Sequence, residues 1–285
     1  MECELDNITV HYEIVGQGKP IVMIHGWPAD HRQAVDHLES VFLQREGWQR
    51  IYLDLPGMGQ TRGADWIIGS DQMLEVLTQF IDQVIPGQRF AVAGISYGGY
   101  LARGLVHRRA SFINGALFVV PMMTADSSKR ISPVHKVLVK DQSFVAELAH
   151  LDPGIAQGLR DVIVVQDRRL LENQWVKTFI AEAATLADEK FLARVGEHYA
   201  LTIDLDTLPE PCSAPMLFLM GGQDSIGYPR SLNFLENYPR ASFVILDRAG
   251  HGLWLEQATL YSALVHEWLN RVEEWIISSD DDASN

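Results

Sequence analysis

The chain has 285 residues, of which 47% are hydrophobic, and carries a formal net charge of −14. This length suits one large core, or one domain with an insertion. An acidic surface repels phosphate groups, so we expect no nucleic acid and no membrane surface as a partner. The acidic N-terminus lacks the features of a signal peptide, and no run reaches the ~20 apolar residues of a membrane span. Cys3 and Cys212 predict two reduced thiols in a cytoplasmic protein.

The opening residues alternate in polarity and lead to Gly16-Gln17-Gly18, which favours a β-hairpin at that point. The continuous apolar run 20–24 follows and is typical of a strand buried on both faces of a parallel sheet. It ends at His25-Gly26-Trp27-Pro28. Gly26 permits close backbone approach, and Trp27 offers a backbone N–H, which Pro28 lacks.

Four polar residues after this turn raise the question of a metal site: Asp30, His31, Asp36 and His37. His31 and His37 are six residues apart, a spacing that does not place both on one face of a helix. We therefore expect a solvated helix here and no metal ligands.

Apolar runs and helical patterns then alternate along the chain. The runs are 50–53, 90–93, 116–120, 216–220 and 243–246, and the helical stretches are 71–84, 100–107 and 255–277. This alternation predicts an α/β fold, with a mostly parallel β-sheet flanked by helices. The interval 121–211 does not show this regular alternation of strand and helix patterns. We expect it to be a helical cap inserted into a core domain made of residues 1–120 and 212–285.

Gly94-Ile95-Ser96-Tyr97-Gly98 follows the run 90–93 and precedes a helical stretch. This G-x-S-x-G pattern is typical of a nucleophile on a sharp strand-to-helix turn, because glycines on either side let the strand and the helix approach closely. We therefore expect Ser96 to be the catalytic nucleophile.

A serine hydroxyl needs a base, and the base needs an acid to orient it. His251 lies in the loop after the last apolar run, and Asp224 follows the run before that. Both positions belong to the edge of a parallel sheet where ligands bind. The order Ser96, Asp224, His251 along the chain is the one expected for a hydrolase with this turn. Asp54 is an alternative acid, although its loop is more typical of a structural turn.

Acyl transfer also needs hydrogen-bond donors for the oxyanion. The backbone N–H groups of Tyr97 and Trp27 are the candidates. Residues predicted to bind substrate or line the pocket are Trp27, Met122, Met123, Trp175 and Phe179.

The chain resembles the α/β-hydrolase superfamily over almost its whole length. The motifs that carry this resemblance are HGWP at 25–28, DLPGMG at 54–59, GISYGG at 94–99, GGQD at 221–224 and AGHG at 249–252. The resemblance implies the triad Ser96, Asp224 and His251, and a cap over the core. HGWP is similar to the turn of epoxide hydrolases and haloalkane dehalogenases, but these have an aspartate where this chain has Ser96.

The sequence therefore predicts a serine hydrolase of small carboxylic esters that acts through an acyl-enzyme. We expect no cofactor, no metal, a small-molecule ester as partner, and a monomer or homodimer. Two alternatives stay open. One is hydrolysis of a lactone, an amide or a C–C bond by the same triad, and the other is a ligand receptor of this fold with slow turnover.

Overall fold

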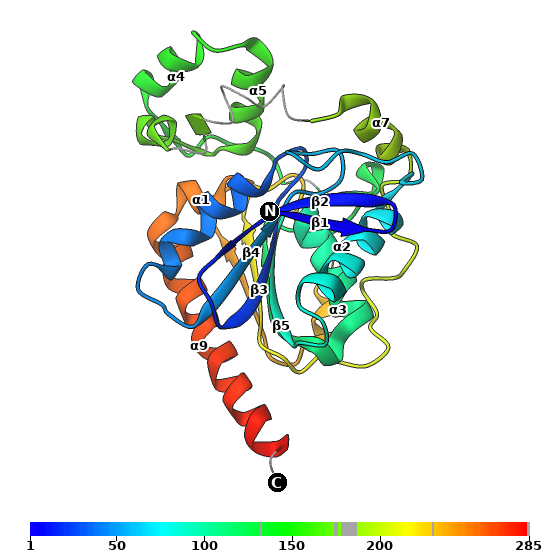
Figure 1. Cartoon of the computed structure of the whole chain (residues 1–285). Coiled ribbons are helices and arrows are strands. Elements are labelled where there is room, and N and C mark those ends of the chain that lie inside the picture. Colours follow the sequence, from blue (N-terminus) through cyan, green and yellow to red (C-terminus); the bar gives the residue numbers. More distant parts are fainter. Residues whose placement is uncertain (132, 174–175, 178–186, 230, 284–285) are drawn as a thin grey trace.

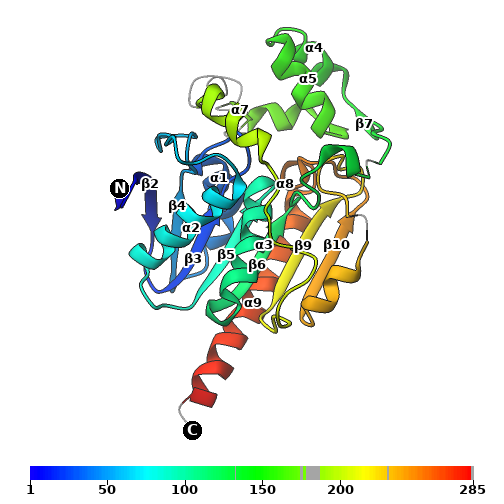
Figure 2. The ribbon, with the colours of Figure 1, turned by 90° about the vertical axis from the view of Figure 1, so that its right-hand side faces the viewer.

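The structure is a computed structural model that describes residues 1–285 except 132, 174–175, 178–186, 230 and 284–285. Its centre is an eight-stranded sheet in the order β1-β2-β4-β3-β5-β6-β9-β10 (Figures 1 and 2). The strands are β1 (Glu2–Leu5), β2 (Ile8–Val15), β3 (Lys19–Ile24), β4 (Trp48–Leu53), β5 (Phe90–Ile95), β6 (Ile113–Val119), β9 (Met216–Gly221) and β10 (Ala241–Leu246). β1 and β2 pair antiparallel to their neighbours, and every pair from β4 to β10 is parallel.

Helices cover both faces of this sheet. They are α1 (His31–Phe42), α2 (Ser70–Val84), α3 (Tyr97–Arg109), α8 (Leu253–Glu256) and α9 (Ala258–Ala283). One core joins one face to α2 and α3, and a second joins the other face to α1 and α9. In α9 the buried side chains recur at helical spacing: Tyr261, Val265, Trp268, Leu269 and Val272. The α/β fold expected from the alternating pattern is therefore confirmed.

Two details differ from the expectations. The prediction of a hairpin at residues 16–18 is wrong, because β4 lies between β2 and β3 in the sheet. The hairpin joins β1 to β2 instead, with Leu5 opposite Ile8 across a turn at residues 6–7. β10 is apolar but forms the edge of the sheet, so its Ile245 is 41% exposed. An apolar run alone does not distinguish an edge strand from an interior one.

The interval 121–211 contributes α4 (Gln142–Leu148), α5 (Pro153–Val162), α7 (Glu189–Glu197) and the short parallel pair β7 (Val139–Lys140) and β8 (Val165–Gln166). These elements lie over one end of the sheet, with α4 and α5 beside each other and α7 apart from them (Figures 1 and 2). Part of the interval has a small core of its own, made of Phe144, Leu148, Ala156, Leu159, Ile163, Leu170 and Val176. Short 3-10 helices span Ala110–Phe112, Ser127–Lys129, Arg168–Glu172 and Asn233–Asn237.

Within the described residues, no helix combines the length and the hydropathy that a membrane crossing requires. Cys3 and Cys212 are both free and buried, and burial raises the pKa of each thiol.

Candidate active site

Ser96 lies between β5 and α3 in a strained backbone conformation. Its φ is 52° and its ψ is −114°, a region that residues other than glycine rarely occupy. The surrounding glycines explain why the chain can turn so sharply. A Cβ on Gly94 would lie 2.3 Å from the carbonyl oxygen of Gly98, and a Cβ on Gly98 would lie 2.3 Å from that of Ile24. Strand, turn and helix therefore touch through their backbones, as the G-x-S-x-G pattern predicts.

The structure brings the three expected side chains together, although they come from distant parts of the chain. His251 Nε2 is 3.0 Å from Ser96 Oγ, and His251 Nδ1 is 2.9 Å from Asp224 Oδ2. A carboxylate only accepts hydrogen bonds, so Nδ1 donates to Asp224. In the neutral imidazole this leaves a lone pair on Nε2, facing the serine hydroxyl.

Asp224 is completely buried, and its other oxygen is also bonded. Asp224 Oδ1 accepts hydrogen bonds from the backbone N–H groups of Ile226, at 2.8 Å, and Gly227, at 3.0 Å. Burial by itself would raise the pKa of Asp224. The nearby His251 and the two N–H donors outweigh that effect, so the pKa of this carboxyl is lowered. The group therefore stays ionised at neutral pH and fixes the tautomer of His251.

Glu256, at the end of α8, holds the loop that carries His251. Its Oε2 accepts a hydrogen bond from Gly250 N at 2.7 Å, and its Oε1 accepts from Val164 N at 2.6 Å and Val165 N at 2.8 Å. Burial raises the pKa of Glu256 despite these donors. One carboxylate thus joins the residue before His251 to the interval 121–211. Sequence reasoning missed this residue, for which the only signal was a glutamate five positions after the histidine.

The two candidate oxyanion donors lie on turns that meet at Ser96. Tyr97 is the first residue of α3, where a backbone N–H has no acceptor within its own helix. Trp27 follows Gly26, whose Cβ would lie 3.3 Å from the Cβ of Ser96. His25 holds the Gly26–Trp27 turn in place. It donates from Nδ1 to the Gly26 carbonyl at 2.7 Å and accepts at Nε2 from Leu55 N at 2.9 Å.

Aromatic rings surround these donors. Tyr97 stacks on Tyr199, with centroids 4.9 Å apart, and Trp27 packs edge-on against both rings. A cavity of about 490 Å³ opens beside them. Its lining residues are Trp27, Pro28, Ala187, Glu189, Leu192, Ala193, Gly196 and Tyr199. Tyr199, which sequence reasoning did not assign to the pocket, thus reaches the site from the interval 121–211.

The other predicted pocket residues have different outcomes. Met122 is buried next to the nucleophile, since its backbone N–H donates to the Ser96 carbonyl at 3.0 Å. Met123 is partly buried and its sulfur is 3.8 Å from a nitrogen of Arg103. Neither methionine lines the cavity beside Trp27. Trp175 and Phe179 lie outside the described residues.

The expectation that His31 and His37 lie on a solvated helix is wrong. They are only 6% and 3% exposed, because α1 packs against the sheet. His37 lies against Trp254, with ring centroids 3.7 Å apart, and burial lowers its pKa to about 3. His31 donates from Nδ1 to Asp54 Oδ1 at 2.8 Å. Asp54 pairs with His31 and not with His251, so Asp224 is the acid that the structure places beside the candidate base.

Comparisons with known proteins identify the family to which the chain belongs. The sequence matches the alpha/beta hydrolase family over residues 21–264. The chain therefore belongs to the alpha/beta hydrolase family, and it is a hydrolase.

Individual relatives add detail. The chain is 25% identical over 266 residues to a pimeloyl-[acyl-carrier protein] methyl ester esterase from Legionella pneumophila strain Corby, covering 92% of this chain and 100% of that protein. It is 22% identical to the AB hydrolase superfamily protein YisY of Bacillus subtilis, over 93% of this chain and 97% of that one. An alpha/beta superfamily hydrolase from Oenococcus oeni PSU-1 superposes with a TM-score of 0.81 at 25% identity, covering 96% of this chain and 99% of that chain.

Proposed function

We propose that the protein is a serine esterase that cleaves small carboxylic esters through an acyl-enzyme on Ser96. The observation that carries this proposal is the bonded series Asp224–His251–Ser96, with a strained serine at the start of α3. A helix N-terminus favours negative charge, so α3 would stabilise an anion that forms beside Ser96.

In the proposed mechanism, His251 Nε2 takes the proton of Ser96 Oγ while that oxygen attacks the ester carbonyl. The backbone N–H groups of Tyr97 and Trp27 donate to the tetrahedral oxyanion. His251 then protonates the leaving alcohol as the C–O bond breaks. Water, deprotonated by His251, attacks the acyl-enzyme and releases the acid, and the proton returns to Ser96. Asp224 remains ionised and stabilises the imidazolium. No step needs a metal or a cofactor.

We propose further that residues 121–211 act as a cap on a core of residues 1–120 and 212–285. The cavity beside Trp27 and Tyr199 supports this, because core and cap residues line it together. Met122, Met123, Trp175 and Phe179 remain proposed walls of the acyl pocket. A cytoplasmic location, with a monomer or homodimer as the working unit, also remains part of the proposal.

The relatives bear on the choice of ester. Several are named pimeloyl-[acyl-carrier protein] methyl ester esterases, which favours methanol as the leaving alcohol here. The apolar residues of the cavity favour an acyl chain of short to medium length. We therefore propose methyl esters of such acids as the first substrates to test.

The test compares wild type with Ser96→Ala on a panel of methyl and p-nitrophenyl esters. A fluorophosphonate should attach to Ser96 of the wild type, and Ser96→Ala should fold normally, resist labelling and lose nearly all turnover. Lactones, amides and C–C bond substrates belong in the same panel. Near wild-type turnover by Ser96→Ala would refute the mechanism. Labelling with a single slow burst and no turnover of any ester would instead favour a receptor.

A further inference from the structure

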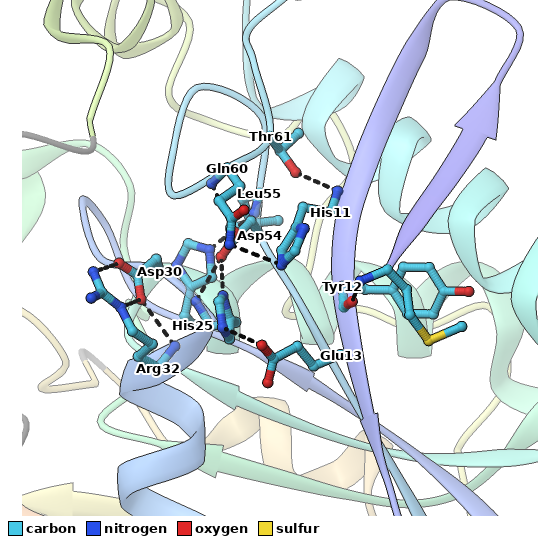
Figure 3. Close-up of polar contacts among 12 residues, drawn as sticks. His11, Tyr12, Glu13, His25, Asp30, Arg32, Asp54, Leu55, Gln60 and Thr61 are labelled. Atoms are coloured by element: carbon cyan, nitrogen blue, oxygen red, sulfur yellow. Dashed lines mark hydrogen bonds and ion pairs between the residues drawn. The ribbon is translucent and has the colours of Figure 1, made fainter.

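A second group of titratable side chains lies outside the proposed active site. It consists of His11 and Glu13 on β2, His31 at the start of α1, and Asp54 after β4. Figure 3 shows the side chains of His11 and Glu13, both on β2, on the same side as Asp54, which follows β4. One potential ligand atom each of His11, Glu13 and His31 lies within 4.8 Å of the others. The proposed esterase mechanism uses none of these side chains.

The hydrogen bonds of His31 leave an unusual pair of atoms face to face. Because the Asp54 carboxylate can only accept, His31 donates to it from Nδ1. The opposite ring nitrogen, Nε2, is 3.5 Å from Glu13 Oε1. In neutral His31 both of these atoms carry lone pairs. A cation between them, either a proton on Nε2 or a metal ion, would relieve the repulsion between these lone pairs.

The charges around His31 favour a cation. The ring nitrogens of His31 lie 2.8 Å from Asp54 Oδ1 and 3.5 Å from Glu13 Oε1. Among the described residues, neither Asp54 nor Glu13 forms an ion pair with lysine or arginine; both pair with His31.

We propose that His11, Glu13 and His31 form a binding site for a divalent transition-metal ion of the zinc type. Imidazole nitrogen and carboxylate oxygen are ligands that such ions prefer. Asp54 would orient His31 from behind, as carboxylates do for metal-bound histidines. Asp54 is itself fixed, because it also accepts from His31 N and Gln60 N, each at 2.8 Å. The ion would join β2 to α1 and take no part in hydrolysis.

The distances suit this assignment. Ligand atoms around tetrahedral zinc lie about 3.4 Å apart, given metal–ligand bonds of about 2.1 Å. The 3.5 Å from His31 Nε2 to Glu13 Oε1 is close to that value. The Gln60 amide nitrogen donates to His11 Nε2 at 3.1 Å, so a metal ion would bind His11 through Nδ1 or displace the exposed Gln60 side chain from Nε2. The expectation that the chain has no metal site rested on the spacing of His31 and His37. In the fold, His31 instead lies beside His11 and Glu13 of β2.

The experiment uses the full chain, stripped with EDTA and dialysed, and titrated with Zn²⁺ by calorimetry and with Co²⁺ by visible absorption. Wild type should bind one equivalent of each ion, and Co²⁺ should give the ligand-field bands of a site with nitrogen ligands. His11→Ala and Glu13→Gln should each weaken binding by at least about tenfold. Both residues are at least partly exposed, so these variants should fold.

The matched controls are His150→Ala and Glu4→Gln, which remove an exposed histidine and an exposed glutamate elsewhere. Both should bind the ions as wild type does, and so should Ser96→Ala, which separates this proposal from the esterase proposal. Absence of stoichiometric binding to wild type would overturn the site and leave a proton as the bridge. Equal affinity in wild type, His11→Ala and Glu13→Gln would overturn it as well.

Discussion

At the scale of single residues, Ser96 combines backbone strain with a bonded base. A positive φ at a non-glycine residue costs free energy, and the fold maintains it through the backbone contacts of Gly94 and Gly98. This backbone conformation holds the Ser96 hydroxyl at the end of β5, within hydrogen-bond distance of His251 Nε2. The buried Asp224 in turn makes His251 present an unprotonated Nε2.

Asp224→Asn tests this division of roles. The amide would donate to His251 Nδ1 and move the ring proton to Nε2, so we expect kcat to fall by about four orders of magnitude. Because the pKa of Asp224 is lowered, its ionised form stabilises the fold above the unfolded pKa of about 3.9. That contribution is lost as pH falls through the folded value.

Steady-state kinetics and melting curves across pH are the measurements, and the difference in Tm between wild type and Asp224→Asn should narrow at acid pH. Asp6→Asn, at an exposed aspartate in the turn between β1 and β2, is the control and should match wild type. A mild loss in Asp224→Asn would contradict the assignment.

At the scale of elements, the packing of β3, β5 and α3 depends on glycine. A Cβ on Gly98 would lie 2.3 Å from one backbone oxygen and 2.4 Å from a second, and neither can yield without moving β3. At Gly158 in α5, by contrast, an added Cβ would have nothing within 4 Å of it. Close packing therefore requires glycine at position 98, whereas position 158 has room for a side chain.

We expect Gly98→Ala to lower the free energy of unfolding by about 3 kcal/mol or more, because backbone must shift. Gly158→Ala, the matched control, should raise it by about 0.5–1 kcal/mol, since alanine favours a helix interior. Urea denaturation measures both. Equal effects in the two variants would show that close packing is not the reason for Gly98.

Glu256 joins the loop of His251 to Val164 and Val165. The variant Glu256→Gln tests whether these bonds position His251 or only stabilise the fold. The new amide must direct its NH₂ group at Gly250 N or at Val164 N and Val165 N, so one set of bonds is lost. We expect kcat/KM to fall roughly ten- to a hundredfold, because a small displacement of His251 spoils its alignment.

The fluorophosphonate labelling rate of Ser96 should fall in parallel in Glu256→Gln. Glu267→Gln, on the exposed side of α9, is the control and should label normally. A lower Tm with unchanged labelling would mean that Glu256 is structural and does not position the base.

At the scale of the whole molecule, residues of the interval 121–211 and the turn at Trp27 line one cavity together. Leu192 of α7 lines this cavity, whereas Leu159 of α5 belongs to the separate small core. The two leucines are similarly buried, at 7% and 3% exposure. The same substitution at each position can thus separate an effect on the pocket from an effect on stability.

Leu192→Ala should move the optimum of kcat/KM toward longer acyl chains, because it enlarges the cavity. Leu159→Ala should leave the profile unchanged, and each variant should lose about 2–5 kcal/mol of stability. The measurement is an acyl-length series of esters with wild type and both variants. An identical shift in both, or in neither, would mean that the cavity does not select the acyl chain.

The fold class and the candidate catalytic residues could be predicted from the sequence. Continuous apolar runs predict buried parallel strands, and the residues after such runs lie at one edge of a sheet, so Ser96, Asp224 and His251 could be proposed without coordinates. The five residues of the G-x-S-x-G pattern are consecutive in the chain, at 94–98. A pattern of consecutive residues can be recognised from the sequence alone.

The contacts between distant segments could not be predicted from the sequence and become visible in the folded chain. The pairing of β2 with β4 removed the expected hairpin at residues 16–18 and placed His11 and Glu13 beside His31. The packing of α1 buries His31 and His37, and the position of α8 lets Glu256 join the loop of His251 to the interval 121–211. Such contacts depend on strand order and on which helix face meets the sheet. Residue spacing fixes neither of these, since both arise from the burial of apolar surface summed over the whole chain.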